Sequence, residues 1–247
     1  AGRESIPQLI AASGNISPSG IRKVVVHGLP ARLRGCYANL GWHTREAHRT
    51  YILDIAGKDF AAVESGFRRD ARRALRKAKA NATIQELGGR STWVKPYYGL
   101  YAETMRRLGS NPRPIAFFEL MDDLIQRLGK DGAYARMACV GDEPVAGLIS
   151  FIHDGRMHIF SNVSAHEAAT GHINDILYAE TIRYAVETRI GRVDFGLSPL
   201  DPQSGLCIFK EKWGTRSESL YSAIMKGRIP AFRNLLERLG RLGSLAR

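Results

Sequence analysis

The sequence predicts a mixed α/β (α+β) protein in which a sheet carries helices on its faces. Segments of alternating or β-branched residues, typical of strands, are interleaved with segments whose apolar residues recur every three or four positions, as in helices. The second half of the chain follows the order strand, hairpin, strand, helix, strand and strand. With 247 residues, of which 44% are hydrophobic, the chain can form one large or two small domains around a sizeable core.

The first half of the chain is expected to contain three strands and three helices. The strands lie at 23–27, 49–55 and 82–87, and the helices at 57–80, 94–108 and 115–128. Six apolar residues of the first helix recur at steps of three and four and form one face: Phe60, Val63, Phe67, Ala71, Ala74 and Ala78. Pro112 and Pro114 precede the third helix, as is common where a helix begins.

The second half begins with three strands and continues into a helix. Strands are expected at 134–140, 145–153 and 156–161, and the pair Asp154-Gly155 is typical of a hairpin turn. A helix begins at Asn174, and strands follow at 193–196 and 219–225. Apolar residues then form one stripe over 229–245 with arginines opposite, which predicts a basic amphipathic helix that packs against the protein or lies on a membrane surface.

The basic residues are concentrated in two segments. Of the net charge of +12, residues 57–80 contribute +5 and residues 226–247 another +5. Like charges at i and i+4 repel by about 0.2–0.5 kcal/mol per pair, so folding does not favour this clustering. A polyanionic partner such as tRNA, a nucleotide-linked substrate or an anionic membrane explains it; solvated helix faces are the alternative. The candidate tRNA-binding residues are Arg68, Arg69, Arg72, Arg73, Arg76 and Lys77.

Several kinds of site are disfavoured by motifs that the sequence lacks. It has no dinucleotide-binding or phosphate-binding glycine loop, no His-Glu-x-x-His zinc motif and no Gly-x-Ser-x-Gly nucleophile elbow. The three cysteines, Cys36, Cys139 and Cys207, lie far apart without metal-ligand spacing, which indicates reduced thiols in a cytoplasmic protein. No run of 18 apolar residues predicts a membrane-spanning helix. We therefore expect no metal site.

Six segments, taken in order, resemble the Fem family of peptidyltransferases, and together they span about residues 40–225. They are Tyr51–Ile55, Phe67–Ala78, Tyr97–Phe118, Pro144–Phe151, Gly191–Gly196 and Gly205–Gly214. The segment Phe67–Ala78 contains the Arg-x-x-Arg-Lys-Ala pattern that the family shows near the end of a helix. The best match is Gly191-Arg-Val-Asp-Phe-Gly196 followed by Gly205-Leu-Cys-Ile-Phe-Lys-Glu-Lys-Trp-Gly214.

The resemblance implies two lobes, each a variant of the GNAT acyltransferase fold. The first lobe would comprise residues 1–130, shorter than is usual in the family, and the second residues 131–225, before the C-terminal helix at 226–247. Family members pass an aminoacyl group from aminoacyl-tRNA to an amine, often on a peptidoglycan precursor. The resemblance therefore implies a cytoplasmic aminoacyltransferase that uses aminoacyl-tRNA as co-substrate, needs no other cofactor and acts on a peptide or nucleotide-linked peptide.

Lys210 and Phe209 are the candidate catalytic residues. Aminolysis of an ester passes through a tetrahedral oxyanion, which a fixed positive charge in a dry site stabilises. Lys210 follows an apolar run, 206–209, so its ammonium is expected at a pocket wall. The resemblance places the matching Phe-Lys pair near the tRNA acceptor end, where Phe209 would stack on a base, a contact worth about 1–3 kcal/mol. The alternative is a surface lysine after a buried strand residue. Asp194 is interpreted as a structural residue, with general base as the alternative.

Five further residues are candidates for substrate binding. Arg113 lies four residues before Phe117, where the family places a basic residue that contacts the acceptor end of the tRNA. Arg106 and Arg107 are neighbouring candidates, and Phe160 and Asn162 complete the set. Each of the three arginines is equally well explained as a solvated helix charge.

The loop before the helix at Asn174 bears on the identity of the acyl donor. Acetyl-CoA enzymes of the GNAT fold generally hold the pyrophosphate with backbone amides of an Arg/Gln-x-x-Gly-x-Gly/Ala loop that caps this helix. The corresponding stretch 165–172 retains only Gly171 of that pattern, which favours aminoacyl-tRNA. Two alternatives stay open: an acyl-CoA-dependent N-acyltransferase of the same fold, and a non-catalytic RNA-binding or membrane-binding module.

Overall fold

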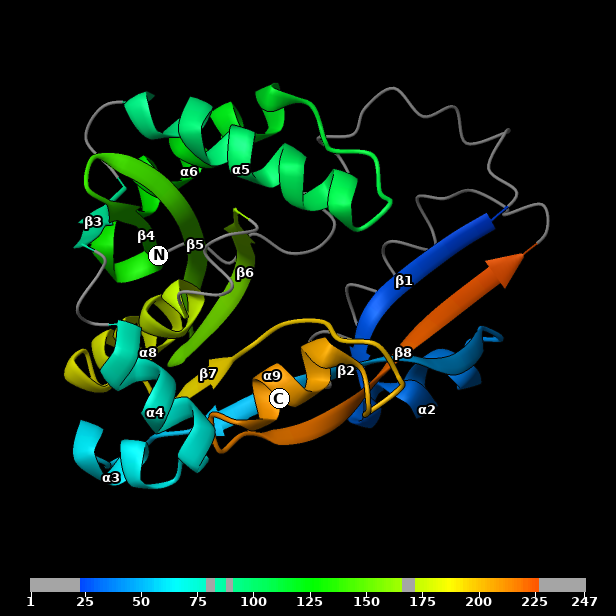
Figure 1. Ribbon diagram of the computed structural model, residues 1–247. Coiled ribbons are helices and arrows are strands. Elements are labelled where there is room, and N and C mark those ends of the chain that lie inside the picture. Colours follow the sequence, from blue (N-terminus) through cyan, green and yellow to red (C-terminus); the bar gives the residue numbers. More distant parts are fainter. Residues whose placement is uncertain (1–22, 79–82, 88–90, 166–171, 227–247) are drawn as a thin grey trace. The chain divides into compact units, whose positions relative to one another are not determined.

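The computed structural model describes residues 23–78, 83–87, 91–165 and 172–226 (Figure 1). The chain forms two compact units, residues 1–49 with 218–247 and residues 50–217. The predicted boundary between residues 130 and 131 falls inside the larger unit. The predicted division into two lobes of one fold, 1–130 and 131–225, stays a prediction. The predicted helix at 229–245 lies outside the described residues.

The smaller unit is built on an antiparallel strand pair. β1 (Lys23–Pro30) pairs with β8 (Arg216–Lys226), which confirms the strands predicted at both places. α2 (Ala31–Asn39) follows β1 directly. Sequence patterns do not predict α2, because Tyr37 is its one buried side chain and no continuous apolar face exists. Tyr37 packs edge-to-face on Trp42 in the core of this unit.

The larger unit contains a sheet with the strand order β2-β7-β6-β5-β4-β3. The strands are β2 (His43–Asp54), β7 (Arg192–Asp194), β6 (Arg156–Ser164), β5 (Glu143–His153), β4 (Ala133–Val140) and β3 (Thr83–Glu86). Neighbouring strands are antiparallel except for β6 and β7, which are parallel. These strands confirm the predicted ones, with small shifts at most ends; β2 begins six residues earlier than predicted, at His43 instead of Arg49.

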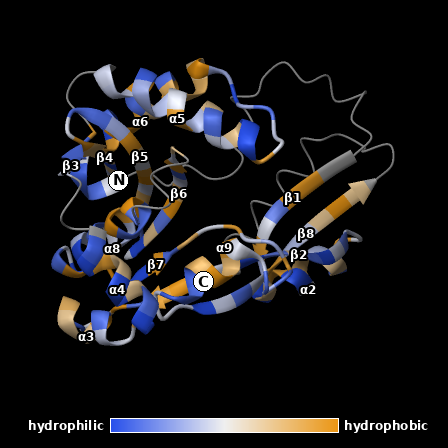
Figure 2. Cartoon of the chain, in the orientation of Figure 1, coloured by the Kyte–Doolittle hydropathy of each residue, from blue (hydrophilic) through white to orange (hydrophobic). Residues whose placement is uncertain are grey.

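Helices cover both faces of this sheet, as the fold class predicts. A 3-10 turn, η2 (Ser91–Trp93), leads into α5 (Val94–Arg107), which lies with α6 (Ile115–Gly132) against β4, β5 and β6 (Figure 1). α8 (Ile173–Glu187) contacts β4, β5 and β7, and α3 and α4 pack on it. Leu148 and Ile149 are neighbours on β5 but belong to the two different apolar cores that result, so β5 is apolar on both faces (Figure 2).

The prediction of one basic helix over 57–80 is wrong. The segment forms two helices, α3 (Phe60–Ser65) and α4 (Arg69–Ala78). Asp59 caps α3, since its carboxylate accepts a hydrogen bond from the N–H of Ala62 at 2.7 Å.

The break between α3 and α4 has its cause in a distant part of the chain. Arg68 N–H donates to the carbonyl of Lys212 at 2.8 Å, a bond to another segment instead of to the preceding helical turn. Gly214 has a φ of 74°, and a Cβ on it would lie 2.7 Å from the carbonyl oxygen of Gly66. The two backbones therefore meet at a pair of glycines, at the point where α3 ends.

The apolar run before Lys210 forms a short helix, α9 (Gly205–Glu211), rather than a strand. Ser204 caps it, because its hydroxyl accepts from the N–H of Cys207 at 3.3 Å. Among the described residues, no helix combines the length and the apolar character that crossing a bilayer requires.

Candidate functional site

The parallel strands β6 and β7 separate within the sheet of the larger unit. Their hydrogen-bonded register ends with His158 opposite Asp194. β6 continues to Ser164, whereas the chain after Asp194 turns towards β2 (Figure 1). We call this divergence the splay; residues 159–164 of β6 lie on one side of it and residues 195–198 on the other. Beyond the paired stretch, the edge of β6 is not hydrogen-bonded to β7.

β6 carries a β-bulge at the splay. On β5, Ile149 pairs with Ser161 and Ser150 pairs with Ile159, so Phe160 has no partner in the ladder. An extra residue of this kind bends a strand, re-aims its side chains and leaves its own backbone groups outside the ladder. The bulge therefore makes the β6 edge a place where backbone groups can contact a substrate.

Asp194 lies at the vertex of the splay and is held by three donors. Its carboxylate accepts from the hydroxyl of Thr50 and from the N–H of Gly196 at 2.8 Å, and its second oxygen lies 3.5 Å from Nδ1 of His158. Burial raises the pKa of Asp194, but the hydrogen bonds outweigh burial and bring the pKa below its usual value. Asp194 is therefore ionised at neutral pH and anchors the loop that follows β7.

Lys210, on α9, has its ammonium buried beside the splay. The residue is 3% exposed, so the alternative of a surface lysine is wrong. Nζ donates to the carbonyls of Gly196 (2.9 Å) and Leu197 (3.0 Å) and to the hydroxyl of Ser198 (2.9 Å). Burial lowers the pKa of Lys210 to about 8, against the opposing effect of the Asp194 carboxylate. Lys210 is thus mainly charged at neutral pH and fixes the backbone on one side of the splay.

Phe209, the other candidate catalytic residue, belongs to an aromatic cluster. Its half-buried ring lies 4.9 Å from the ring of Tyr178 and 6.2 Å from that of Trp213, measured between centroids. The ammonium of Lys212 lies 4.2 Å from the same ring. Stacking of Phe209 on a terminal base stays a prediction.

A buried ion pair lies at the beginning of α8. Asp175, in the first turn, is 3% exposed, and its carboxylate binds the ammonium of Lys212 and lies 3.1 Å from Nδ1 of His172. The predicted loop before this helix, including Gly171, lies outside the described residues except for its ends. The N-terminus of a helix favours an anion, and here the chain supplies one itself.

Asn162 connects β6 to α8. Its side-chain N–H groups donate to the carbonyl of Gly147 and to Oδ1 of Asn174, both at 3.2 Å. The side chains of Asn162 and Asn174 are half-buried. Asn162 therefore presents an amide at the splay on the face that α8 covers.

Phe160 faces the opposite way, towards α6. Its ring is 43% exposed and lies nearly parallel to that of Phe117, at 6.3 Å between centroids. The guanidinium of Arg113 stands over Phe117 at 4.5 Å from its centroid. The structure thus brings two predicted substrate-binding residues, Phe160 and Arg113, to one surface through Phe117.

Arg106 and Arg107, at the end of α5, lie in different surroundings. Arg107 donates to the carbonyl of Ser164, the last residue of β6, at 3.4 Å. Arg106 donates to the carbonyl of Ala102 on its own helix at 3.2 Å. The contact of Arg107 links it to the β6 edge, whereas the contact of Arg106 does not.

The candidate tRNA-binding residues lie on α4 or directly before it. Five are exposed: Arg68, Arg69, Arg73, Arg76 and Lys77. Arg72 is half-buried and donates to the carbonyl of Ser65 at 2.9 Å. Arg68, Arg69 and Arg73, together with Asp70, line an open depression of about 530 Å³. Within the described residues Arg68 forms an ion pair with Asp70 at 3.5 Å, and none is found for the other four exposed cations.

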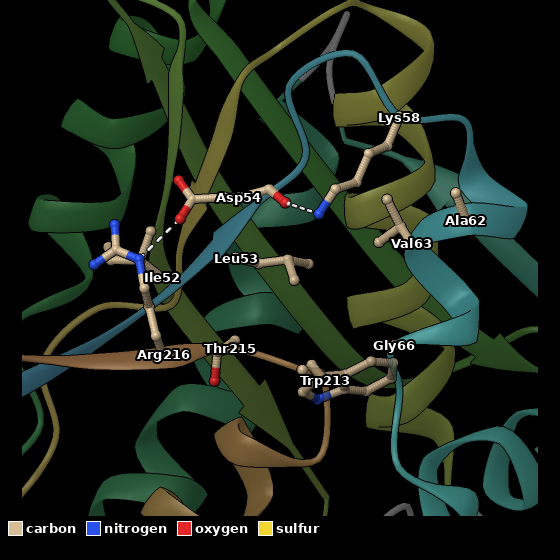
Figure 3. A pocket seen from close by; sticks show the side chains of 11 residues that line it. Ile52, Leu53, Asp54, Lys58, Ala62, Val63, Gly66, Trp213, Thr215 and Arg216 are labelled. Atoms are coloured by element: carbon tan, nitrogen blue, oxygen red, sulfur yellow. Dashed lines mark hydrogen bonds and ion pairs between the residues drawn. The ribbon is translucent and has the colours of Figure 1, made fainter.

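Another cavity, of about 200 Å³, lies between β2, α3 and the segment after α9 (Figure 3). Asp54 in its lining binds Arg216 at 2.8 Å and Arg192 at 2.7 Å, and its backbone carbonyl accepts from Lys58 at 2.9 Å. The hydrogen bond from Arg216 lowers the pKa of Asp54, although partial burial opposes it. None of the predicted site residues lines this cavity, and its polar groups are engaged with one another, so we do not assign it as the site.

Sequence reasoning misses three groups of the splay: His158, Thr50 and Ser198. They meet because β7 pairs with both β6 and β2, and strand order cannot be read from local patterns. A weak signal existed on β6, where His158 stands between the apolar residues Met157 and Ile159. An imidazole on the polar side of a half-buried strand is a candidate for contact with a ligand.

The splay combines a strand edge that is not paired with β7 beyond His158, a buried cation and an imidazole–carboxylate pair. Backbone groups of a strand can hold an extended acyl group, a fixed positive charge can stabilise an oxyanion, and an imidazole can accept a proton. These three elements suit the transfer of an acyl group to a nucleophile.

Comparison with known proteins identifies the fold. A model of the acetyltransferase (GNAT) domain matches residues 65–202, which is more than half of the chain. The structure of FemX is similar with a TM-score of 0.68 at 16% identity, over 93% of this chain and 78% of that one. The C-terminal domain of a putative lysylphosphatidylglycerol synthetase from Agrobacterium fabrum is similar with a TM-score of 0.58 at 14% identity, over 100% of this chain and 79% of that one.

A third similar structure is L-PGS from Bacillus licheniformis, with a TM-score of 0.58 at 18% identity, over 96% of this chain and 76% of that one. A search of curated protein sequences found no match. At these identities a structural likeness shows the fold alone. It confirms the predicted GNAT-like fold and its resemblance to the Fem structures.

Proposed function

The chain belongs to the acetyltransferase (GNAT) domain family, and on this basis we propose that it transfers an aminoacyl group from aminoacyl-tRNA to an amine, forming an amide bond. It is an acyltransferase of GNAT type; the donor and the acceptor are the proposal. The acceptor is a peptide or a nucleotide-linked peptide of the peptidoglycan-precursor kind. A donor of this kind places the reaction in the cytoplasm and requires no bound cofactor.

The exposed cations of α4 are the observation that carries this choice of donor. Arg69, Arg73, Arg76 and Lys77 are exposed, and no ion pair is found for them within the part of the chain that the structure describes. The phosphate backbone of a nucleic acid neutralises such a row of cations and releases its own counterions, which favours binding. One similar structure is described as a putative lysylphosphatidylglycerol synthetase, whose product carries an aminoacyl group, and this supports the same class of donor.

The first turn of α8 argues against acyl-CoA, the second candidate donor. Pyrophosphate of CoA at this helix would lie beside the buried carboxylate of Asp175, and like charges repel strongly where water is excluded. Lys212 and His172 already contact that carboxylate. The acyl-CoA-dependent reaction is nevertheless favoured by the family's own description as acetyltransferases, so the first experiment compares the two donors.

The candidate residues divide between the two substrates. Lys210 stabilises the tetrahedral oxyanion by exchanging one of its three hydrogen bonds in residues 196–198 for a bond to the substrate. Phe209 stacks on the terminal base of the donor. Asn162 and Arg107 contact the donor at the β6 edge.

The acceptor binds on the other face of the sheet. Phe160 with Phe117 offers it an apolar surface, and Arg113 offers a positive charge beside that surface. Arg106 adds a further positive charge on α5. This combination suits an acceptor that carries an anionic group next to its amine-bearing chain.

A paired donor assay tests the proposed function. The protein is incubated with a mixed peptide acceptor and either a pool of charged tRNA or acetyl-CoA. We expect loss of charged tRNA with formation of an amide product, and no release of free CoA. Release of CoA with an acetylated product would show that the protein is an acyl-CoA-dependent N-acyltransferase instead. If neither donor were consumed, the non-catalytic module would be favoured.

Charge reversal on α4 tests tRNA binding separately from chemistry. Replacing Arg69, Arg73 and Arg76 by Glu should weaken tRNA binding at least about tenfold near physiological salt. The slope of the logarithm of the binding constant against the logarithm of the salt concentration should become shallower by about two to three. Arg72 is left intact because it holds Ser65. The matched control reverses three exposed cations of α5 and α6: Lys95, Arg127 and Lys130. Equal affinities for the two triple variants would mean that α4 is not the tRNA surface.

A further inference from the structure

We infer that His158 is the general base that removes the proton from the acceptor amine, with Asp194 as its positioning residue. This assignment rests on the proposed transfer to an amine. An attacking amine must lose a proton as its nitrogen bonds to the acyl carbon, and a base held at the site accelerates that step. Lys210 is mainly protonated at neutral pH and Phe209 has no basic group, so neither candidate catalytic residue supplies it.

The contact with Asp194 favours the tautomer of the imidazole that a base needs. Nδ1 of His158 lies 3.5 Å from Asp194, whose carboxylate is itself fixed by Thr50 and by the N–H of Gly196. An ionised carboxylate accepts a proton donor, so Nδ1 carries the hydrogen and Nε2 keeps its lone pair. The side chain of His158 is 48% exposed, so Nε2 is open to a substrate.

The imidazole adjoins the splay on the face assigned to the acceptor. A Cβ on Gly196 would lie 4.0 Å from Nε2 of His158, so the ring borders the segment that Lys210 holds. Met157 and Ile159 belong to the apolar core that α8 covers. Side chains alternate along a strand, so His158 lies on the opposite face of the sheet. That face also carries Phe160, which the bulge turns towards α6.

The step balances without a further reactant. The amine nitrogen forms a bond to the acyl carbon, and the carbon-to-oxygen bond of the donor ester breaks with its electron pair. The proton leaves nitrogen for Nε2 and passes from the imidazolium to the leaving ribose oxygen. Asp194 remains ionised throughout and stabilises the imidazolium.

Several charges surround the imidazole and must be considered in any pH profile. Asp194 faces it from β7, and Lys210 from α9 acts on Asp194. Arg156 precedes it by two residues on β6, and Arg192 is the pairing partner of Arg156. Arg192 is itself bound by Asp54.

Two amines of different basicity separate a base from a structural residue. The full-length protein and its His158→Gln variant are assayed with the donor that the wild type consumes, using glycinamide and hydroxylamine as acceptors. Both amines lose a proton as the amide forms, but glycinamide is partly an ammonium ion near pH 7 and is the weaker nucleophile, whereas hydroxylamine is largely uncharged and attacks esters with little help from a base. We expect His158→Gln to lower kcat/KM for glycinamide by at least about 100-fold near pH 7 and to lower the hydroxylamine rate far less.

The loss with glycinamide should shrink as the pH rises, because hydroxide in the solvent then increasingly replaces the imidazole as the base. The variant Asp194→Asn should also lower the glycinamide rate, and because Asp194 anchors the loop after β7 it should lower the hydroxylamine rate to a smaller extent. Equal losses with both amines, or a loss that does not recover at high pH, would overturn the assignment of His158. If the wild type transfers an acyl group to neither amine from either donor, the proposed function itself fails.

Discussion

Replacing Lys210 by methionine will lower the turnover of acyl transfer by about 100- to 1000-fold while changing the affinity for the donor little. Loss of one group that stabilises an oxyanion typically costs this much in turnover, because the interaction strengthens only as charge develops. Methionine has a similar length and keeps the apolar part of the side chain in place. Single-turnover kinetics at saturating donor, beside equilibrium binding of the donor, give the two quantities.

The same substitution tests whether the charge of Lys210 is buried, through the pH dependence of the free energy of unfolding. The pKa of Lys210 falls from 10.5 to about 8 on folding, so the folded protein releases its proton first as the pH rises. The cost of burying the charge is present in full below pH 8 and is relieved between pH 8 and 10.5, where the unfolded chain binds more protons. Full relief corresponds to about 3 kcal/mol, at 1.36 kcal/mol per pKa unit.

The wild type should therefore gain stability relative to Lys210→Met as the pH rises. At neutral pH two effects oppose each other in the variant: the cost of burying the charge is removed, whereas Leu197 and Ser198 lose their donor at a cost of about 1–3 kcal/mol, so the two stabilities should be similar. Urea unfolding at pH 7 and pH 9.5 measures the difference at each pH. A difference that does not change with pH would show that Lys210 carries no buried charge, and an unchanged turnover would remove it from the mechanism.

The strands could be predicted from the sequence because their information is local. β4, β5 and β6 are runs of alternating or β-branched residues bounded by turns, and each lies close to its predicted range. The prediction of one basic helix was wrong because the end of that helix depends on a distant segment. The periodicity of its apolar residues continues through Phe67, and that residue is buried as predicted. The helix nevertheless ends at Gly66, where the backbone of Gly214 packs from nearly 150 residues further on.

The candidate site divides in the same way. A motif predicts that Lys210 and Phe209 are functional, but it does not predict what surrounds them. The ammonium is surrounded by three acceptors between Gly196 and Ser198. Their positions follow from the path of the chain after β7, which no local pattern encodes. Local patterns do not predict a role for His158, because its partner Asp194 lies on a parallel strand, and parallel strands are joined by long connections that leave the register open.

Replacing Gly196 by alanine will distort the backbone at the vertex of the splay. Gly196 has a φ of 74°, a conformation that costs an L-residue about 1–2 kcal/mol. A Cβ there would lie 2.9 Å from the carbonyl oxygen of Ile159, a backbone atom that cannot rotate away. We therefore expect a total loss of at least about 2 kcal/mol in the free energy of unfolding, measured by urea titration.

The same alanine should also lower turnover, since it pushes the loop after β7 away from β6. Gly196 is bonded to Asp194 through its N–H and to Lys210 through its carbonyl, so both groups would shift. Misplacement by about 1 Å can cost about 100-fold in rate. Gly99→Ala is the matched control: Gly99 lies within α5, a Cβ there meets no atom within 4 Å, and alanine favours a helix. If Gly196→Ala were as stable and as active as Gly99→Ala, the close approach of the two strands at the vertex of the splay would not exist in solution.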